Sequence, residues 1–244
     1  WEKILYPLFL LMLLFLTGGA LGRVGKTVSH PAYYSYRVLN SFPHDPKAFT
    51  QGLIYSDDYF YESTGLYGCS SLRQINPADG RIIKQIDLSK EFFAEGIAIY
   101  NGRIILLTWR EQRGFVYDKN SLSLLETFTY PTEGWGLTFD GEHLIMSDGS
   151  SVLTFLDPKT FTPVKRIKVK SNGRSLIGLN ELEFIKGKIY ANVWQTDDIV
   201  IIDPANGRVT GWINLKGLLE PRSHPGHSVD VLNGIAYDEE ADRL

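Results

Sequence analysis

The residues with the clearest potential for chemistry are one glutamate and three tryptophans. Glu95 begins the triplet Glu95-Gly-Ile, and Trp109, Trp135 and Trp194 lie at related points of a pattern that recurs along the chain. A carboxyl group buried among indole rings loses hydration, which raises its pKa and lets it exchange a proton near neutral pH. We therefore interpret Glu95 as a candidate general acid and base.

The same pattern supplies neutral polar groups and a further ring. Gln51, Asn180 and Asn233 each begin a triplet similar to that of Glu95, and Phe49 lies two residues before Gln51. If the fold brings the triplets together, these side chains would surround the carboxyl group and could hold a polar organic ligand.

These residues also have ordinary structural explanations. Glu95 could pair with Arg110 or Arg113, and the tryptophans could pack between sheets. Glu181 and Glu183 share one face of a predicted strand, and the sequence leaves open whether that face lines the interior or contacts solvent.

The sequence offers little for metal, thiol or nucleic-acid chemistry. His224-Pro-Gly-His227 contains two histidines without an acidic third ligand, so we expect surface residues there. Cys69 is the only cysteine, which excludes an intramolecular disulfide and a zinc site with paired thiolates. A net charge of −3 gives no support for nucleic-acid binding.

The elements that must position these residues are strands. After residue 33, β-branched and aromatic side chains alternate with polar ones, and hairpin dipeptides such as Asn101-Gly102 separate the runs. Five triplets have their third residues at 53, 97, 137, 182 and 235, at intervals of 44, 40, 45 and 53. Repeated units of about this length with four strands each are typical of β-propeller blades.

We therefore predict an all-β fold, a five-bladed β-propeller over residues 33–244. Four blades would be complete within 49–215, and the fifth would begin near residue 228 and be incomplete at its C-terminal end. Residues 33–43 should add an outer strand to the last blade and cover its open edge. The innermost strands of a propeller line one channel, so the triplets should meet at one mouth of it. The alternative is a β-sandwich whose hairpins resemble one another by chance.

Residues 1–22 are expected to form a helical signal peptide or membrane anchor. A 13-residue apolar run at 4–16 is short for a membrane span but typical of a signal peptide, and a small-x-small pattern follows at Ala20-x-Gly22. We expect an exported monomer, periplasmic or extracellular, with residues 23–32 as a linker. An uncleaved run would attach it to a membrane through residues 4–22.

Eight short motifs between residues 49 and 194 occur together in one known family, and the likeness to that family covers roughly residues 33–244. They are Phe49-Thr-Gln-Gly-Leu53, Tyr61-Glu-Ser-Thr-Gly-Leu-Tyr-Gly68, Ser71-Leu-Arg73, Glu95-Gly-Ile97, Leu107-Thr-Trp-Arg110, Glu133-Gly-Trp-Gly-Leu137, Leu179-Asn-Glu-Leu-Glu183 and Asn192-Val-Trp194. In this combination they resemble the plant-type glutaminyl cyclases (glutamine cyclotransferases), which also occur in bacteria. The resemblance implies a five-bladed propeller that converts the N-terminal glutamine of a peptide into pyroglutamate and releases ammonia.

The resemblance also implies roles for individual residues. Glu95 matches the family's catalytic acid and base. Four residues match the aromatic cage around the substrate: Phe49, Trp109, Trp135 and Trp194. Gln51 and Asn180 match polar groups that hold the substrate. Family members usually continue with a stretch that carries an active-site lysine, which this sequence does not contain, so the resemblance predicts an incomplete ring and site. No metal or organic cofactor is required.

Two other functions fit a propeller. A calcium-dependent lactonase would need the oxygens of Gln51, Glu95, Asn180 and Asn233 to converge on one ion, whereas the tryptophans favour an organic ligand. A non-catalytic propeller would bind peptides or support a complex in the cell envelope, and replacing Glu95 would leave that binding largely intact.

Overall fold

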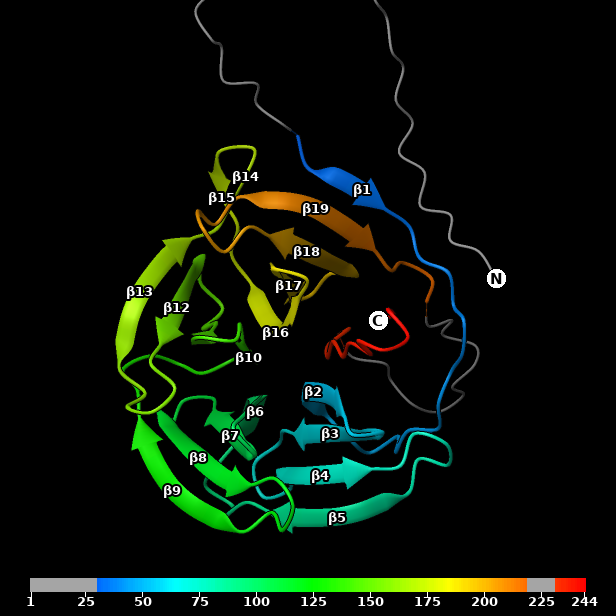
Figure 1. Cartoon of the computed structure of the whole chain (residues 1–244), viewed down its shortest axis with the longest axis vertical. Coiled ribbons are helices and arrows are strands. Elements are labelled where there is room, and N and C mark those ends of the chain that lie inside the picture. Colours follow the sequence, from blue (N-terminus) through cyan, green and yellow to red (C-terminus); the bar gives the residue numbers. More distant parts are fainter. Residues whose placement is uncertain (1–29, 219–230) are drawn as a thin grey trace, which may run out of the picture.

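A computed structural model describes residues 30–218 and 231–244 of the chain. The named elements in these ranges are all β-strands, and none of the described residues forms a helix that could cross a membrane. The predicted signal or anchor helix at 1–22 and most of the predicted linker at 23–32 lie outside the described residues. Figure 1 shows the sheets arranged around one centre. The predicted all-β propeller arrangement is therefore confirmed.

Four sheets, here named blades one to four, follow one another along the chain, and each contains four strands that pair antiparallel in chain order. The first of these strands is innermost and the fourth lies near the rim, where blade four carries one further strand outside it (Figure 1). Blades one and two contain β2 (Thr50–Ser56), β3 (Tyr59–Thr64), β4 (Ser71–Ile75), β5 (Ile82–Asp87), β6 (Ala94–Tyr100), β7 (Arg103–Thr108), β8 (Arg113–Asp118) and β9 (Leu124–Thr129). Blades three and four contain β10 (Leu137–Phe139), β11 (Leu144–Met146), β12 (Val152–Leu156), β13 (Pro163–Lys168), β16 (Leu179–Ile185), β17 (Lys188–Val193), β18 (Asp198–Ile202) and β19 (Val209–Asn214).

Tight turns between strands follow the predicted dipeptides. Asn101 and Gly102, between β6 and β7, have φ angles of 49° and 71°. Two successive positive φ values define the type I′ turn, whose twist matches that of the strands it joins. The local sequence thus sets the pairing of the two innermost strands of blade two.

Apolar clusters fill the interfaces between neighbouring blades. Blades one and two enclose a cluster that includes Leu72, Ile97 and Leu106, and blades two and three enclose one around Leu137. A third cluster, around Leu182, lies between blades three and four. Alternate side chains of each strand enter these interfaces, so the two-residue periodicity of the sequence produces the ring.

The prediction of five blades is wrong for the described residues, which form four. The four complete blades predicted within 49–215 are present, but residues 231–244 contribute only an isolated bridge between Asp238 and Arg243. This segment lies between blade four and blade one (Figure 1). It supplies a fifth triplet, Asn233-Gly-Ile, but no described strand pairs with that triplet, and two side chains of blade four bind its backbone N–H groups instead.

The extra N-terminal strand was assigned to the wrong blade. β1 (Ala32–Tyr34) pairs in parallel with β19, the outer strand of blade four, so the edge it covers belongs to that blade. Its three residues begin one position earlier than predicted, inside the expected linker. A short hairpin that the sequence did not indicate, β14 (Lys170–Ser171) with β15 (Arg174–Ser175), lies between blades three and four.

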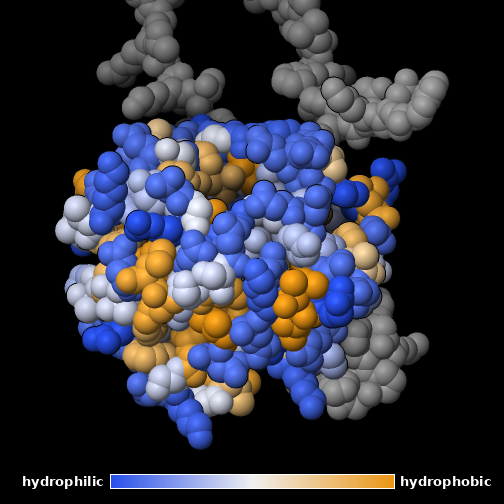
Figure 2. Space-filling model, turned by 60° about the horizontal axis from the view of Figure 1, so that its bottom comes forward, coloured by the Kyte–Doolittle hydropathy of each residue, from blue (hydrophilic) through white to orange (hydrophobic). Residues whose placement is uncertain are grey.

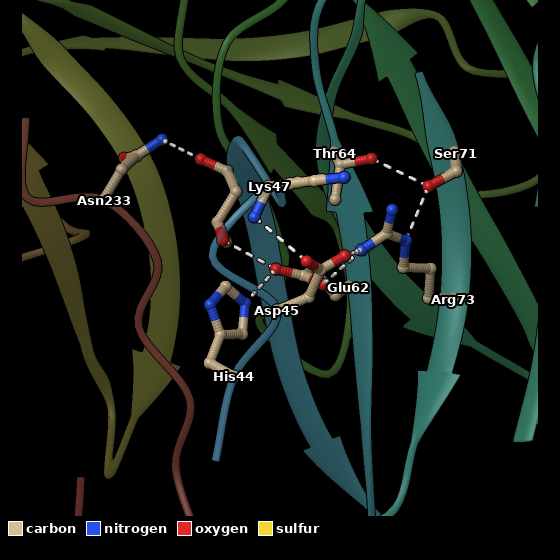
Figure 3. A network of polar contacts seen from close by, with 9 residues as sticks. His44, Asp45, Lys47, Glu62, Thr64, Ser71, Arg73 and Asn233 are labelled. Atoms are coloured by element: carbon tan, nitrogen blue, oxygen red, sulfur yellow. Dashed lines mark hydrogen bonds and ion pairs between the residues drawn. The ribbon is translucent and has the colours of Figure 1, made fainter. Parts of the chain in front are cut away.

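A polar network binds the segment before blade one to that blade (Figure 3). Glu62, on β3, is fully buried and accepts hydrogen bonds from Thr50 Oγ1 at 2.6 Å and from His44 Nε2 at 2.7 Å. The backbone carbonyl of Thr50 in turn accepts from Asn233 Nδ2 at 3.2 Å. Arg73 pairs with Asp45 at 3.1 Å. The network therefore connects residues 44–45, blade one and residues 231–235.

Candidate functional site

The repeated triplets meet at the centre of the ring, as predicted. A carbon atom added at the Cα of Gly96 would lie 2.5 Å from the backbone nitrogen of Leu137, and one at Gly136 would lie 2.0 Å from the carbonyl oxygen of Asn180. The Gly96 N–H donates to the carbonyl of Trp135 at 2.6 Å. Glycine is required because the backbones of adjacent blades come this close together.

Irregular strand pairing marks the first residues of three triplets. The antiparallel registers of β2 with β3, β6 with β7 and β16 with β17 shift at the triplets, which leaves Gln51, Glu95 and Asn180 without a strand partner. Such β-bulges redirect side chains and are frequent next to active sites. All three side chains are buried.

Glu95 is buried without a partner for its charge. The residue is 6% exposed, and its carboxyl group makes no hydrogen bond or ion pair with any residue that the structure describes. Its backbone carbonyl accepts from Ser63 Oγ. Burial, and then the nearby carboxylates of Glu133 and Glu111, raise the pKa of Glu95 well above its usual range. Burial therefore favours the protonated form of this carboxyl group, which is able to donate a proton.

The arginines considered as partners of Glu95 do not pair with it. Arg110 pairs with Glu133 instead, with Nε 3.4 Å from Oε1. Its guanidinium group also stacks over Trp109, with the guanidinium carbon 3.7 Å from the ring centroid. Arg113 lies on β8 and is exposed.

Aromatic rings from all four blades form an arc in the same register. The ring centroids are 6.2 Å apart for Phe49 and Phe93, 5.5 Å for Phe93 and Trp109, and 5.5 Å for Trp135 and Trp194. The two halves of the arc join at Glu133, whose Oε2 accepts from the indole nitrogens of Trp109 at 2.8 Å and Trp135 at 3.0 Å. The structure thus brings together all four predicted cage residues.

The two predicted amides are placed differently from each other. Gln51 Oε1 accepts from Asn233 Nδ2 at 3.1 Å, which leaves its NH2 group unengaged by the described residues. Within those residues the Asn180 side chain makes no hydrogen bond, although its Oδ1 is buried. A buried polar atom without a partner is costly, so Asn180 is suited to a ligand that supplies one.

Glu181 and Glu183 both point toward the interior, which decides between the two alternatives that the sequence left open. Glu181, in the glycine position of its triplet, is fully buried and accepts from the backbone N–H groups of Ile235 at 2.9 Å and Leu53 at 3.3 Å. These two hydrogen bonds connect residues 231–235 to blade one through Glu181. Burial also raises the pKa of the neighbouring Glu183 to about 8.

No metal site is visible in the part of the chain that the structure describes. It contains no group of three or more His, Cys, Asp or Glu side chains placed to hold an ion. His224 and His227 lie outside the described residues. Cys69 is exposed and free.

A groove also lies near the rim between blades one and two. It has a volume of about 350 Å³ and is lined mainly by apolar side chains, including Leu88, Phe92, Phe115 and Leu122. Figure 2, in which the lower rim of Figure 1 comes forward, shows hydrophobic surface between hydrophilic regions there. Its lining includes no residue of the triplets or of the aromatic arc, so we place the candidate site at Glu95.

Two residues of this site were not among the predicted site residues. Phe93 is the central ring between Phe49 and Trp109, and Glu133 joins the two indoles. A signal existed for Glu133, because indole nitrogens near a protein interior need an acceptor and Glu133 lies two residues before Trp135.

Comparison with known proteins gives consistent results. The family model described as glutamine cyclotransferase matches residues 10–244. A glutaminyl-peptide cyclotransferase of Arabidopsis thaliana is 42% identical over 210 residues, which cover 85% of this chain and 66% of the plant protein. The crystal structure of Myxococcus xanthus glutaminyl cyclase superposes with a TM-score of 0.81 at 35% identity, covering 88% of this chain and 91% of that one. This chain thus spans about two thirds of the length of the plant protein.

Proposed function

This chain belongs to the glutamine cyclotransferase family, and we propose that it is a glutaminyl-peptide cyclotransferase, which converts an N-terminal glutamine of peptides or proteins into pyroglutamate and releases ammonia. The structural observation that carries the proposal is a buried, unpaired carboxyl group, Glu95, close to Glu133, which binds the indoles of Trp109 and Trp135. The names of the plant and bacterial relatives support it.

Glu95 supplies both proton transfers of this reaction. The substrate's neutral α-amine attacks its own γ-carboxamide carbon, a new C–N bond forms, and the bond to the carboxamide nitrogen breaks. One oxygen of Glu95 takes the proton that the attacking nitrogen loses, and the carboxyl proton goes to the departing nitrogen, which leaves as ammonia. The neutral acid is thereby restored. A positioned acid and base of this kind accelerates a reaction by about 10²–10⁴-fold.

The aromatic arc holds the glutamine side chain in a folded conformation. Since the reaction is intramolecular, restricting the substrate to conformations in which amine and carboxamide meet removes much of the barrier. The rings also exclude water from the reacting carbonyl group.

Donors for the developing oxyanion come from the amides. The indole nitrogens of Trp109 and Trp135 are engaged by Glu133, and an indole has only one hydrogen to donate. This leaves the NH2 groups of Gln51 and Asn180 and the indole of Trp194, which is 45% exposed. Each can contribute to stabilising the oxyanion.

The test is ammonia release from a short peptide with N-terminal glutamine, with a matched peptide beginning with asparagine as control. The control peptide would have to form a strained four-membered ring, so we expect ammonia from the first peptide only. Equal traces from both peptides, with the protein folded by circular dichroism, would overturn the proposal.

We further propose that the protein acts as an exported monomer. The apolar run at 4–16 supports export, with membrane association through residues 4–22 if the run is retained. Fractionation of cells that express the chain tests this, and recovery from the cytoplasm alone contradicts it.

A further inference from the structure

We propose that Glu133 is a positioning residue, which fixes the indoles of Trp109 and Trp135 around the substrate's glutamine side chain. The proposal rests on the function proposed above, but its geometric part can be tested without turnover. In the mechanism just described Glu133 carries no proton and binds no substrate.

One oxygen atom connects rings from two blades. Trp109 directly follows β7 in blade two, whereas Trp135 lies two residues before β10 in blade three. Glu133 Oε2 accepts from both indole nitrogens, at 2.8 Å and 3.0 Å. Hydrogen bonds to an ionised acceptor are stronger and more directional than neutral ones, so this atom fixes how the two rings lie relative to each other.

The backbone that carries Glu133 is itself held closely. The N–H group of Gly134 donates to the carbonyl of Trp109 at 2.9 Å. A side chain at Gly134 would lie 2.5 Å from the hydroxyl of Tyr130 and 2.7 Å from the carbonyl of Thr108. The acceptor therefore has a defined position without help from the rings, as a positioning residue requires.

Arg110 completes the arrangement on the outer side. Its guanidinium group covers the face of Trp109 and lies 3.4 Å from Glu133 Oε1. Both side chains of this ion pair are partly exposed, at 63% and 39%, so solvent weakens it. The hydrogen bonds to the indoles are therefore the main contribution of Glu133.

The charge of Glu133 also acts on Glu95. Repulsion by Glu133, and next by Glu111, adds to the effect of burial in raising the pKa of Glu95. Replacing Glu133 by a neutral residue lowers that pKa. The high-pH limb of the activity profile, where Glu95 loses its proton, then moves to lower pH.

The experiment compares Glu133→Ala, Glu133→Gln and a control, Glu126→Gln. Glu126 is an exposed carboxylate of β9 that pairs with Arg103 far from the indoles. We expect Glu133→Ala to lower kcat/KM by about 10- to 100-fold. Glu133→Gln keeps an acceptor oxygen, so its kcat/KM should fall less than that of Glu133→Ala. The high-pH limb of its activity profile should still move to lower pH, because the charge is removed. The control should match the wild type.

Indole N–H resonances in ¹⁵N NMR spectra and urea unfolding complete the test. The proposal requires that both Glu133 variants move two indole resonances while the unfolding midpoint stays near that of the wild type. It is overturned if Glu133→Ala has the kcat/KM of the wild type, if the indole resonances do not move, or if lost activity follows lost folding. A wild-type protein that releases no ammonia would instead refute the proposed function, and the resonances would still test the geometry.

Discussion

Two buried glutamates on innermost strands differ in what surrounds their carboxyl groups. Glu95 has no hydrogen-bond partner among the described residues, whereas Glu181 accepts from two backbone N–H groups that belong to blade one and residues 231–235. Burial raises the pKa of both. Burial alone therefore does not identify a catalytic carboxyl group, and the unused hydrogen-bonding capacity of Glu95 sets it apart.

A third buried carboxylate supports the same distinction. Glu62 is fully buried, and it is bound by Thr50 and His44 (Figure 3). Its partners are side chains, whereas those of Glu181 are backbone groups. We interpret both as structural and only Glu95 as reactive, and the predictions below test this division.

The largest expected effect is on turnover in Glu95→Gln. Glutamine has nearly the shape of the neutral acid but exchanges no proton, so we expect ammonia release to fall by about 10²–10⁴-fold. Stability should change little, because no hydrogen bond to the carboxyl group is lost. Ammonia assays and urea unfolding of the two proteins check both statements, and a variant that retains half of the activity would contradict the assignment.

Glu181→Ala should act on stability instead. The substitution leaves the N–H groups of Leu53 and Ile235 without an acceptor, at a cost of about 2–4 kcal/mol in the free energy of unfolding. Urea unfolding measures this loss, with Glu95→Ala as the matched truncation of a buried glutamate. Equal stability of the two variants would remove the distinction between the carboxyl groups.

The sequence predicted the blades well because their causes are local and repeated. Alternating side chains and turn dipeptides such as Asn101-Gly102 specify each blade on its own. The C-terminal residues 231–244 are placed by contacts of another kind. There the triplet at 233–235 is bound by the Glu181 and Asn192 side chains of the adjoining blade four, and such side-chain contacts leave no periodic signal. The five-blade count and the placement of β1 were wrong for this reason.

The candidate site was predicted in part for similar reasons. Trp109, Trp135 and Glu95 share one register of the repeat, so their convergence follows from the fold. Glu133 lies in the segment that links blade two to blade three, and only the folded chain shows that its carboxylate meets both indoles. The β-bulges at Gln51 and Asn180 were likewise not predictable from the sequence.

A smaller effect is expected from the pH dependence of stability through Glu183. Its pKa is raised to about 8 in the folded protein, from an ordinary value of 4.5. Between these values the folded state keeps a proton that the unfolded chain releases, so stability falls as the pH rises through this range, by at most about 1.4 kcal/mol per pH unit. Glu183→Gln stays neutral and should lose this contribution. Unfolding at pH 5.5 and 7.5 should show a larger decrease for the wild type, and parallel decreases would contradict the shift.

The smallest expected effect concerns His44, the partly exposed partner of Glu62. The hydrogen bond to Glu62 is the main cause that raises the pKa of His44. Asp45 raises it further, while burial and Arg73 lower it. A raised pKa means that the stabilisation is complete below the ordinary value of 6.5 and is lost as the pH rises through the folded-state value. His44→Ala should therefore cost about 1 kcal/mol at pH 5.5, since 47% exposure of the side chain limits the gain, and less at pH 9. Urea unfolding at both pH values measures the difference. A cost that is the same at pH 5.5 and 9 would show that the bond to Glu62 does not depend on the charge of His44, and that this carboxylate is held mainly by Thr50.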